Sequence, residues 1–150
     1  MKDKKMKALV LGATGATGKD LVNQLLQDPN YEEVNIFVRN APEIENEKLK
    51  THIVDFEKPQ DWQYLVQGDV AFSCMGTTLK SAGSKEAQKK VDFQYQYDFA
   101  KAAKENDVED YILVSSYGAN SKSKLFYSKM KGELETCVKD LHFPKITIFQ

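Results

Sequence analysis

The sequence predicts an α/β fold with a doubly wound parallel sheet of about six strands and helices on both faces. Short apolar runs alternate with longer amphipathic segments along the whole chain, which is typical of strands joined by crossover helices. Two of the apolar runs end in glycine, as buried parallel strands do when a tight turn follows. A length of 150 residues fits a single domain.

Strand and helix patterns follow one another in the first half of the chain. Residues 7–12 form an apolar run that ends in glycine and predict a buried strand. A helix is expected over residues 17–28, because leucines and a valine recur there at helical spacing until a proline follows. Two further apolar runs predict strands at residues 34–39 and 52–56, and the segment between them is polar and irregular.

The second half continues the alternation. A helical turn at residues 59–67 leads into a fourth strand at residues 69–76, which ends in glycine. The longest helical pattern covers residues 84–105, where apolar residues step by three or four along one face. A strand, a helix and a last strand are then expected at residues 110–116, 125–141 and 145–150. Since crossovers between parallel strands are right-handed, this order predicts a Rossmann-like architecture.

Composition excludes several classes of function. The net charge is -1, and basic residues form no stripe with interleaved aromatics, so we expect no nucleic-acid partner. No apolar run approaches the roughly 20 residues that span a bilayer, so we expect no membrane partner. The apolar run after the basic N-terminus is too short for a signal-peptide core, and we expect a cytoplasmic protein. Cys74 and Cys137 form no metal-binding pattern, so we expect free thiols and no metal.

A glycine-rich turn from Gly12 to Gly18 joins the first strand to the first helix. Gly12 permits the tight turn, Gly15 lets the backbone approach a pyrophosphate, and Gly18 lets the helix pack close to the sheet. The helix N-terminus adds free N–H groups and a positive dipole end. The residues expected to contact a dinucleotide here are Gly12, Thr14, Gly15, Ala16, Thr17 and Gly18, the threonines through their hydroxyls. The alternative is a glycine-rich turn without a ligand.

The end of the second strand indicates which dinucleotide binds. An acidic residue there would bond the ribose 2′-hydroxyl of NAD, whereas an arginine receives the 2′-phosphate of NADP. Here the strand ends in Arg39 followed by Asn40, and Arg39 is the one arginine among 21 basic residues. We therefore expect NADP(H) in preference to NAD(H). The alternative is that Arg39 is a solvated surface residue.

Asp55 and Phe56 end the expected third strand, which places them beside the adenine. Asp55 either hydrogen-bonds the exocyclic amine or caps its own loop.

Two Tyr-x-x-x-Lys pairs occur, and their positions separate them. Tyr127 and Lys131 begin the helix after the fifth strand, at the carboxyl ends of the strands, where ligands bind in open α/β sheets. Tyr97 and Lys101 lie within the long preceding helix, and we treat that pair as a chance match. Tyr127 and Lys131 share one helix face, so the ammonium, together with the positive nicotinamide of the oxidised cofactor, is expected to lower the phenol pKa for acid–base work. Lys131 is also expected to hold the nicotinamide ribose of the cofactor. Ser116, or less favourably Ser115, would bond the substrate oxygen.

These segments together resemble the atypical, NmrA-like branch of the short-chain dehydrogenase/reductase superfamily, and within it the Tat-interacting oxidoreductases and their bacterial relatives. The resemblance rests on GATGATG (12–18), VDFEK (54–58), SCMGTTLKSAG (73–83), residues 114–135 and the ending ITIFQ. It implies that Met75 and Gly76 line the cofactor and that Tyr127 and Lys131 form the active-site pair. Two departures stand out. Asn40 replaces a second arginine, and the family continues past Gln150, so a substrate-pocket segment is expected to be missing.

We therefore expect an NADP(H)-dependent oxidoreductase that transfers hydride to or from a small carbonyl or alcohol substrate. One alternative is a non-catalytic protein that senses NADPH and reports to a regulatory protein partner. A nucleotide-sugar epimerase-like enzyme is the second alternative. Formation of a homodimer is a further alternative. A redox role for Cys74 is another, because this residue lies near the expected nicotinamide position.

Overall fold

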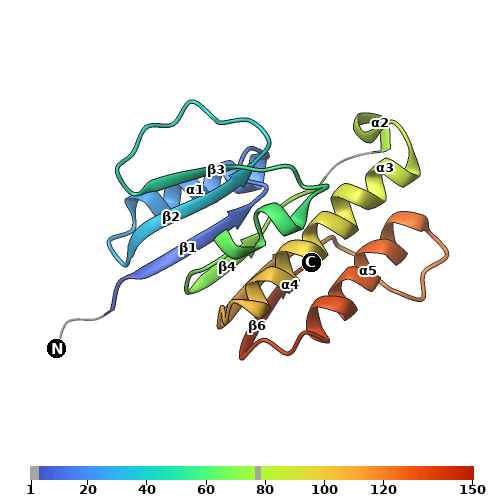
Figure 1. The fold of residues 1–150 in the computed structure, drawn as a ribbon. Coiled ribbons are helices and arrows are strands. Elements are labelled where there is room, and N and C mark those ends of the chain that lie inside the picture. Colours follow the sequence, from blue (N-terminus) through green and yellow to red (C-terminus); the bar gives the residue numbers. More distant parts are fainter. Residues whose placement is uncertain (1–3, 77–78) are drawn as a thin grey trace.

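The computed structural model describes residues 4–76 and 79–150, and it shows one sheet of six parallel strands (Figure 1). The strand order is β3-β2-β1-β4-β5-β6, with the order reversing between β1 and β4. The strands are β1 (Met6–Leu11), β2 (Tyr31–Val38), β3 (Leu49–Ile53), β4 (Val70–Ser73), β5 (Asp110–Val114) and β6 (Lys145–Phe149). The predicted fold class is confirmed.

Helices cover both faces of the sheet. One face carries α1, and the other carries α4 and α5 together with the segment between β3 and β4 (Figure 1). The α-helices are α1 (Ala16–Gln27), α2 (Leu79–Ala82), α3 (Lys85–Lys89), α4 (Gln96–Glu105) and α5 (Phe126–Lys139). Two 3₁₀ turns, η1 (Pro59–Asp61) and η2 (Gln63–Leu65), form the expected helical turn before β4. Within the described residues, no helix is long and apolar enough to cross a membrane.

The core is divided by the sheet, and β1 contributes to both halves. Because successive side chains of a strand point to opposite faces, Leu9 and Leu11 pack with α4 and α5, whereas Ala8 and Val10 pack with α1. All four are fully buried. Strand β1 is therefore held rigidly on both sides, and the glycine turn that follows it starts from a fixed position.

Strand β3 differs from the prediction. It covers Leu49–Ile53 rather than residues 52–56, and it pairs with β2 from Val34↔Leu49 to Val38↔Ile53. It is an edge strand with mixed polar and apolar residues, so it does not form the apolar run that is typical of a buried parallel strand. Asp55 and Phe56 therefore follow the strand in a loop instead of ending it.

The long helical pattern at residues 84–105 also differs. It is interrupted by a π-helical segment, η3 (Lys90–Tyr95), between α3 and α4. A π turn accommodates one extra residue and rotates the side chains that follow it, and such turns are frequent at functional sites. Strand β4 stops three residues before its predicted end, and β5 stops two residues before its predicted end. At β4 the cause is visible, since its last partner on β1 is Leu11, beyond which Gly12 turns away.

Candidate functional site

The turn after β1 depends on its first and third glycines for steric reasons. Gly12 has a φ of +82°, and a Cβ there would lie 2.5 Å from the backbone nitrogen of Met75. A Cβ on Gly18 would collide with the carbonyl oxygen of Gly12. Gly15 is different, because a Cβ there would meet no described protein atom nearer than 3.7 Å. The space beside Gly15 is therefore open to a ligand rather than needed for packing.

The N-terminus of α1 begins at this turn and offers its N–H groups to that space. Gly15 is the N-cap residue, and no side chain caps the helix there. The N–H groups of the first helical turn have no partner within a helix, and they attract anions together with the helix dipole. Thr14, Ala16 and Thr17 are exposed around the same point. The chemistry of this helix end fits a pyrophosphate.

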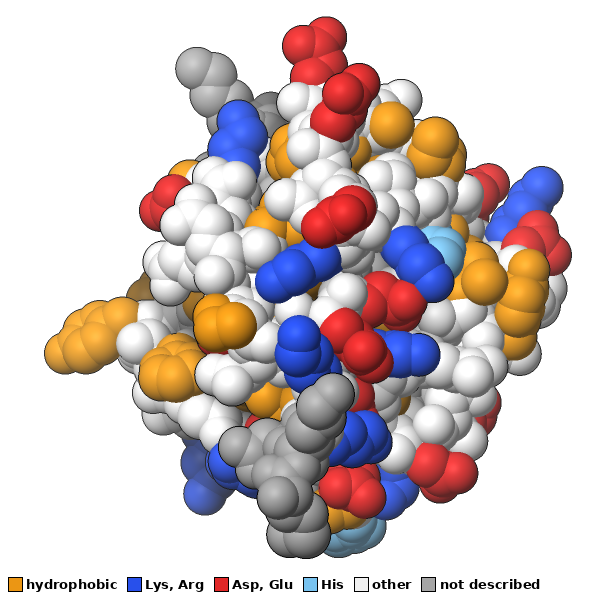
Figure 2. Space-filling view, turned by 90° about the vertical axis from the view of Figure 1, so that its left-hand side faces the viewer, with side chains coloured by type: hydrophobic (Ala, Val, Ile, Leu, Met, Phe, Trp, Pro, Cys, Tyr) orange, Lys and Arg blue, Asp and Glu red, His pale blue; other side chains and the backbone are white. Residues whose placement is uncertain are grey.

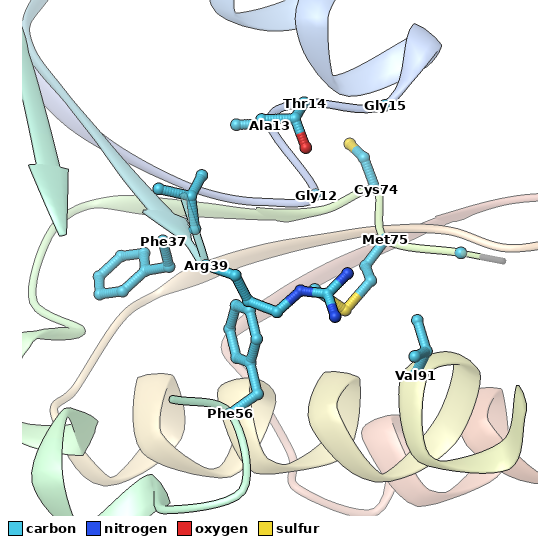
Figure 3. A pocket seen from close by; sticks show the side chains of 12 residues that line it. Gly12, Ala13, Thr14, Gly15, Phe37, Arg39, Phe56, Cys74, Met75 and Val91 are labelled. Carbon is cyan, nitrogen blue, oxygen red and sulfur yellow. The ribbon is translucent and has the colours of Figure 1, made fainter. Parts of the chain in front are cut away.

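A cavity of about 230 Å³ lies at the carboxyl ends of β1, β2 and β4 (Figure 3). Figure 3 shows the Arg39 side chain extending from the end of β2 across this cavity toward Met75. The residues that line the cavity are Gly12, Ala13, Thr14, Gly15, Phe37, Val38, Arg39, Phe56, Cys74, Met75, Gly76 and Val91. The fold thus brings the glycine turn, Arg39, Phe56 and the Met75-Gly76 pair around one space.

The loop after β3 is fixed by its own hydrogen bonds. Asp55 Oδ1 accepts from the N–H of Glu57 at 2.9 Å, so this carboxylate caps its loop. Asp55 is not among the described residues that line the cavity, and its contact with adenine stays a prediction. Phe56 does line it, and its ring stacks on Tyr95 with centroids 5.4 Å apart.

Tyr95 also ties this loop to the helix that faces it. Its hydroxyl donates to Glu57 Oε1 at 2.5 Å. Burial and this carboxylate raise the pKa of Tyr95 to about 12. The phenol therefore stays protonated and keeps the hydrogen bond that holds the Phe56 loop.

Tyr127 lies at the start of α5, and the residue is 39% exposed. Burial and the negative charge of Asp92 raise its pKa, while hydrogen bonding with Ser116 lowers it. The pKa of Tyr127 is raised overall, whereas the sequence predicted that Lys131 would lower it. The physical reason is that Asp92 and desolvation outweigh the other influences on this phenol in the free chain.

Lys131 is buried one helical turn further along α5, with 2% of its side chain exposed. Its Nζ lies 4.0 Å from Oδ1 of Asp92, which is itself fully buried. Burial lowers the pKa of Lys131, and the carboxylates of Asp92 and then Glu135 raise it in opposition. Asp92 also approaches the cavity lining, because a Cβ on the lining residue Gly76 would stand 3.3 Å from its Oδ1. Tyr127 and Lys131 are thereby linked to the cavity through Asp92.

The two serines after β5 have different partners. Ser115 Oγ donates to Glu135 Oε2 at 3.0 Å, and Gln150 Nε2 donates to the same carboxylate at 2.8 Å. Ser116 is the serine whose hydroxyl acts on Tyr127, where it lowers the pKa of the phenol. The geometry therefore favours Ser116 over Ser115 as the partner of the phenol.

Several residues of the site were not predicted. Ala13 and Val91 line the cavity, and Asp92 approaches Lys131. The signal for Asp92 is a polar stripe at intervals of four residues, formed by Gln88, Asp92 and Gln96, all of which are buried. Gly132 is a further case, since a Cβ there would collide with the backbone nitrogen of Ser121. This glycine lets the loop after Ser116 pack against α5 beside Lys131.

Three further features named from the sequence are the pair of Tyr97 and Lys101, Cys74, and the motif at residues 73–83. Tyr97 lies in α4, where its ring stacks with that of Phe93 and packs partly against the core. Cys74 lines the cavity, but burial raises the pKa of its thiol to about 11, which opposes thiolate chemistry. Thr77 and Thr78, within the motif at residues 73–83, lie outside the described residues.

A parallel sheet in this strand order, with an uncapped helix N-terminus after a glycine turn at the switch point, defines a Rossmann-type dinucleotide-binding protein. A comparison with known protein families supports the same class of protein. Residues 12–141 match the NAD(P)H-binding family, and the chain belongs to that family.

Curated relatives cover nearly the whole chain. The chain is 35% identical to "Protein FMP52, mitochondrial" of Candida albicans, over 97% of this chain and 66% of that protein. It is 34% identical to "Protein HTATIP2" of Rattus norvegicus, over 94% of this chain and 60% of that protein. The resemblance to the Tat-interacting type is thereby confirmed. The chain spans less than two thirds of the length of each of these relatives.

Solved structures share the fold at low sequence identity. The WbmH enzyme of Bordetella bronchiseptica in complex with NAD+ aligns with a TM-score of 0.81 and 13% identity, over 95% of this chain and 55% of that chain. UDP-glucose 4-epimerase of Thermotoga maritima with UDP-glucose aligns with a TM-score of 0.78 and 15% identity, over 95% and 54%. These similarities confirm the fold.

The prediction of a cytoplasmic protein is wrong on this comparison. Several curated relatives carry the word mitochondrial in their names. The prediction rested on the shortness of one apolar run, which bears on secretory signals. Mitochondrial targeting segments are instead amphipathic and do not need such a run.

Proposed function

We propose that this chain is the cofactor-binding part of an NADP(H)-dependent oxidoreductase of the short-chain dehydrogenase/reductase type. The observation that carries the proposal is that Tyr127 and the buried Lys131, both at the start of α5, interact with Asp92, whose carboxylate approaches Gly76 of the cavity lining. A phenol, a hydroxyl and an ammonium placed beside a cofactor are the groups that carbonyl reduction needs.

Arg39 supports NADP(H) as the cofactor. It lines the cavity from the end of β2, where the 2′ position of the adenosine ribose is expected. A guanidinium matches a phosphate with two parallel hydrogen bonds. The N-terminus of α1 would hold the pyrophosphate, and Phe56 would pack against the adenine.

A bound nicotinamide supplies a hydride to the carbonyl carbon of the substrate or accepts one from it. In the reducing direction, Tyr127 donates its proton to the carbonyl oxygen, and the product is an alcohol. The raised pKa of Tyr127 suits that direction, because the phenol is protonated at neutral pH. Ser116 hydrogen-bonds the same substrate oxygen, and Lys131 supplies positive charge beside the phenol.

Turnover of carbonyl compounds tests this function. Parent and Tyr127→Phe would be screened with NADPH against aldehydes and ketones, and binding of NADPH, NADP, NADH and NAD would be titrated by calorimetry. We expect Tyr127→Phe to lower turnover by about 10²- to 10⁴-fold, since it lacks the transferable proton, with unchanged NADPH binding. Unchanged turnover would contradict the catalytic role. NADPH binding without turnover of any carbonyl compound would instead favour a non-catalytic binding protein.

A further inference from the structure

Two oppositely charged side chains, one from α5 and one from η3, are buried together, and the acidic one approaches Gly76 of the cavity lining. Lys131 Nζ and Asp92 Oδ1 are 4.0 Å apart, and the side chains are 2% and 0% exposed. Lysine and aspartate are almost never fully buried unless they are paired, because each loses its hydration. A buried pair of this kind contributes little net stability, so its position beside the cavity calls for another explanation.

Asp92 reaches this position through the π turn. The turn lies at Lys90–Tyr95 in the helix that faces α5, and Gln96 anchors it to the end of β4. Gln96 Nε2 donates to the carbonyl oxygens of Met75 at 2.8 Å and of Asp92 at 3.2 Å. Its Oε1 accepts from the hydroxyl of Ser73 at 3.0 Å. The carboxylate is therefore fixed relative to Met75 and Gly76, the residues expected beside the nicotinamide.

We propose that Asp92 is a positioning residue of the active site, which holds the Lys131 ammonium in its charged form and in place beside Tyr127 and the cofactor. This inference rests on the proposed function, because Lys131 acts there on the phenol and the cofactor. Lys131 and Tyr127 are the ionisable groups of α5 that interact with Asp92. Glu135 acts on Lys131 from the next turn of α5, and it already accepts hydrogen bonds from Ser115 and Gln150.

Asp92 raises the pKa values of both Lys131 and Tyr127. Burial lowers the pKa of Lys131, and Asp92 is the largest influence that raises it again. Asp92 also raises the pKa of Tyr127, on which burial is the one larger influence. Neutralising Asp92 should therefore shift both groups to lower pKa values, so that the lysine loses charge and the phenol ionises more easily.

The Asp92→Asn variant of the whole chain tests the proposal, with Asp98→Asn as the matched control. Asp98 lies in α4, where it accepts a hydrogen bond from Gln94 at 2.8 Å. The readout is the ultraviolet titration of tyrosinate, in which the Tyr127 component is identified by subtraction of the Tyr127→Phe titration. We expect Asp92→Asn to shift this component to lower pH and Asp98→Asn to leave it in place. An unshifted component in Asp92→Asn would overturn the proposal.

Turnover separates this proposal from the proposed function. Wherever carbonyl reduction is found, Asp92→Asn should lower kcat/KM by about tenfold and shift its pH profile, with Asp92→Glu restoring part of the rate. A shifted Tyr127 titration without carbonyl turnover would contradict the oxidoreductase while leaving the electrostatic role intact. If Asp92→Asn fails to fold, the neutral double variant Asp92→Asn/Lys131→Met is expected to regain the fold. A double variant that is equally unfolded would overturn the pairing.

Discussion

The carbonyl oxygen of Gly12 occupies the space that a Cβ on Gly18 would need. The two glycines are thus in direct contact, and this contact sets how closely α1 approaches the sheet. Gly15 has no such constraint, since the nearest described protein atom to a Cβ there is 3.7 Å away. We expect Gly18→Ala to lower the free energy of unfolding by about 3 kcal/mol or more, because backbone must move. Urea denaturation measures this loss.

Gly15→Ala is the matched variant that separates packing from binding. Its methyl group enters open space in the free chain, so we expect parent-like stability in the same denaturation experiment. The methyl group would stand where a pyrophosphate must approach the backbone, and NADPH affinity should fall at least tenfold. Parent-like NADPH binding by Gly15→Ala would contradict the assignment of this turn.

The strand–turn–helix at residues 6–27 was predictable because its determinants are local. An apolar run, three glycines and a helical spacing of leucines each act over a few residues. The π turn was not predictable in this way. The spacing of Val91, Tyr95 and Phe99 is equally compatible with an unbroken α-helix. The tie between Gln96 and Met75, 21 residues apart, is a tertiary contact that local periodicity does not encode.

The difference between local and tertiary determinants also applies to the candidate site. Position after β5 distinguishes Tyr127 from Tyr97 as the candidate, and this choice, which stays a prediction, rests on topology alone. In the free chain the pKa of Tyr127 is raised instead of lowered, because burial and Asp92 act on a phenol that was considered only with Lys131 and the cofactor. That carboxylate comes from a different element, and its burial shows only in the folded chain.

Arg39 should determine the preference for the 2′-phosphate. It extends from β2 across the cavity, and hydrogen bonds to charged groups are worth about 1.5–3 kcal/mol. We expect Arg39→Leu to weaken NADPH binding by about 10- to 100-fold and to leave NADH binding unchanged. Arg39→Lys keeps the charge without the planar fork and should lie between the two. Calorimetric titration with both cofactors measures this, and equal losses for NADPH and NADH would exclude a specific phosphate contact.

Ser115 and Ser116 provide a matched pair at the candidate active site. Ser116 lowers the pKa of Tyr127, whereas the hydroxyl of Ser115 donates to Glu135 at 3.0 Å. We expect Ser116→Ala to lower kcat by about a hundredfold, the usual cost of removing one hydrogen-bond donor from a reacting oxygen. Ser115→Ala should change kcat much less. Steady-state kinetics on any carbonyl substrate found for the parent compares them, and the reverse ranking would reassign the substrate contact to Ser115.

Acid stability should depend on Asp69, which joins the start of β1 to the start of β4. Its carboxylate accepts from the N–H of Lys7 at 2.8 Å and from Lys4 Nζ at 3.0 Å. On the face in Figure 2, lysine and acidic side chains lie next to one another in this manner. Burial raises the pKa of Asp69, but the Lys7 N–H and the Lys4 ammonium outweigh it, and the pKa is lowered overall.

A carboxyl group with a lowered pKa in the folded state stabilises the fold above its unfolded pKa, and this contribution disappears as the pH falls through the folded pKa. Asp69→Asn should therefore be less stable than the parent at pH 7 by about 1.5 kcal/mol. The difference should begin to shrink below about pH 4, where the carboxyl of the unfolded chain takes up a proton, and should vanish as the pH falls through the lower pKa of the folded chain. Urea denaturation across this range measures it, with the exposed Asp20→Asn on α1 as the control. A difference that is the same at pH 7 and pH 3 would show that Asp69 acts through packing rather than through its charge.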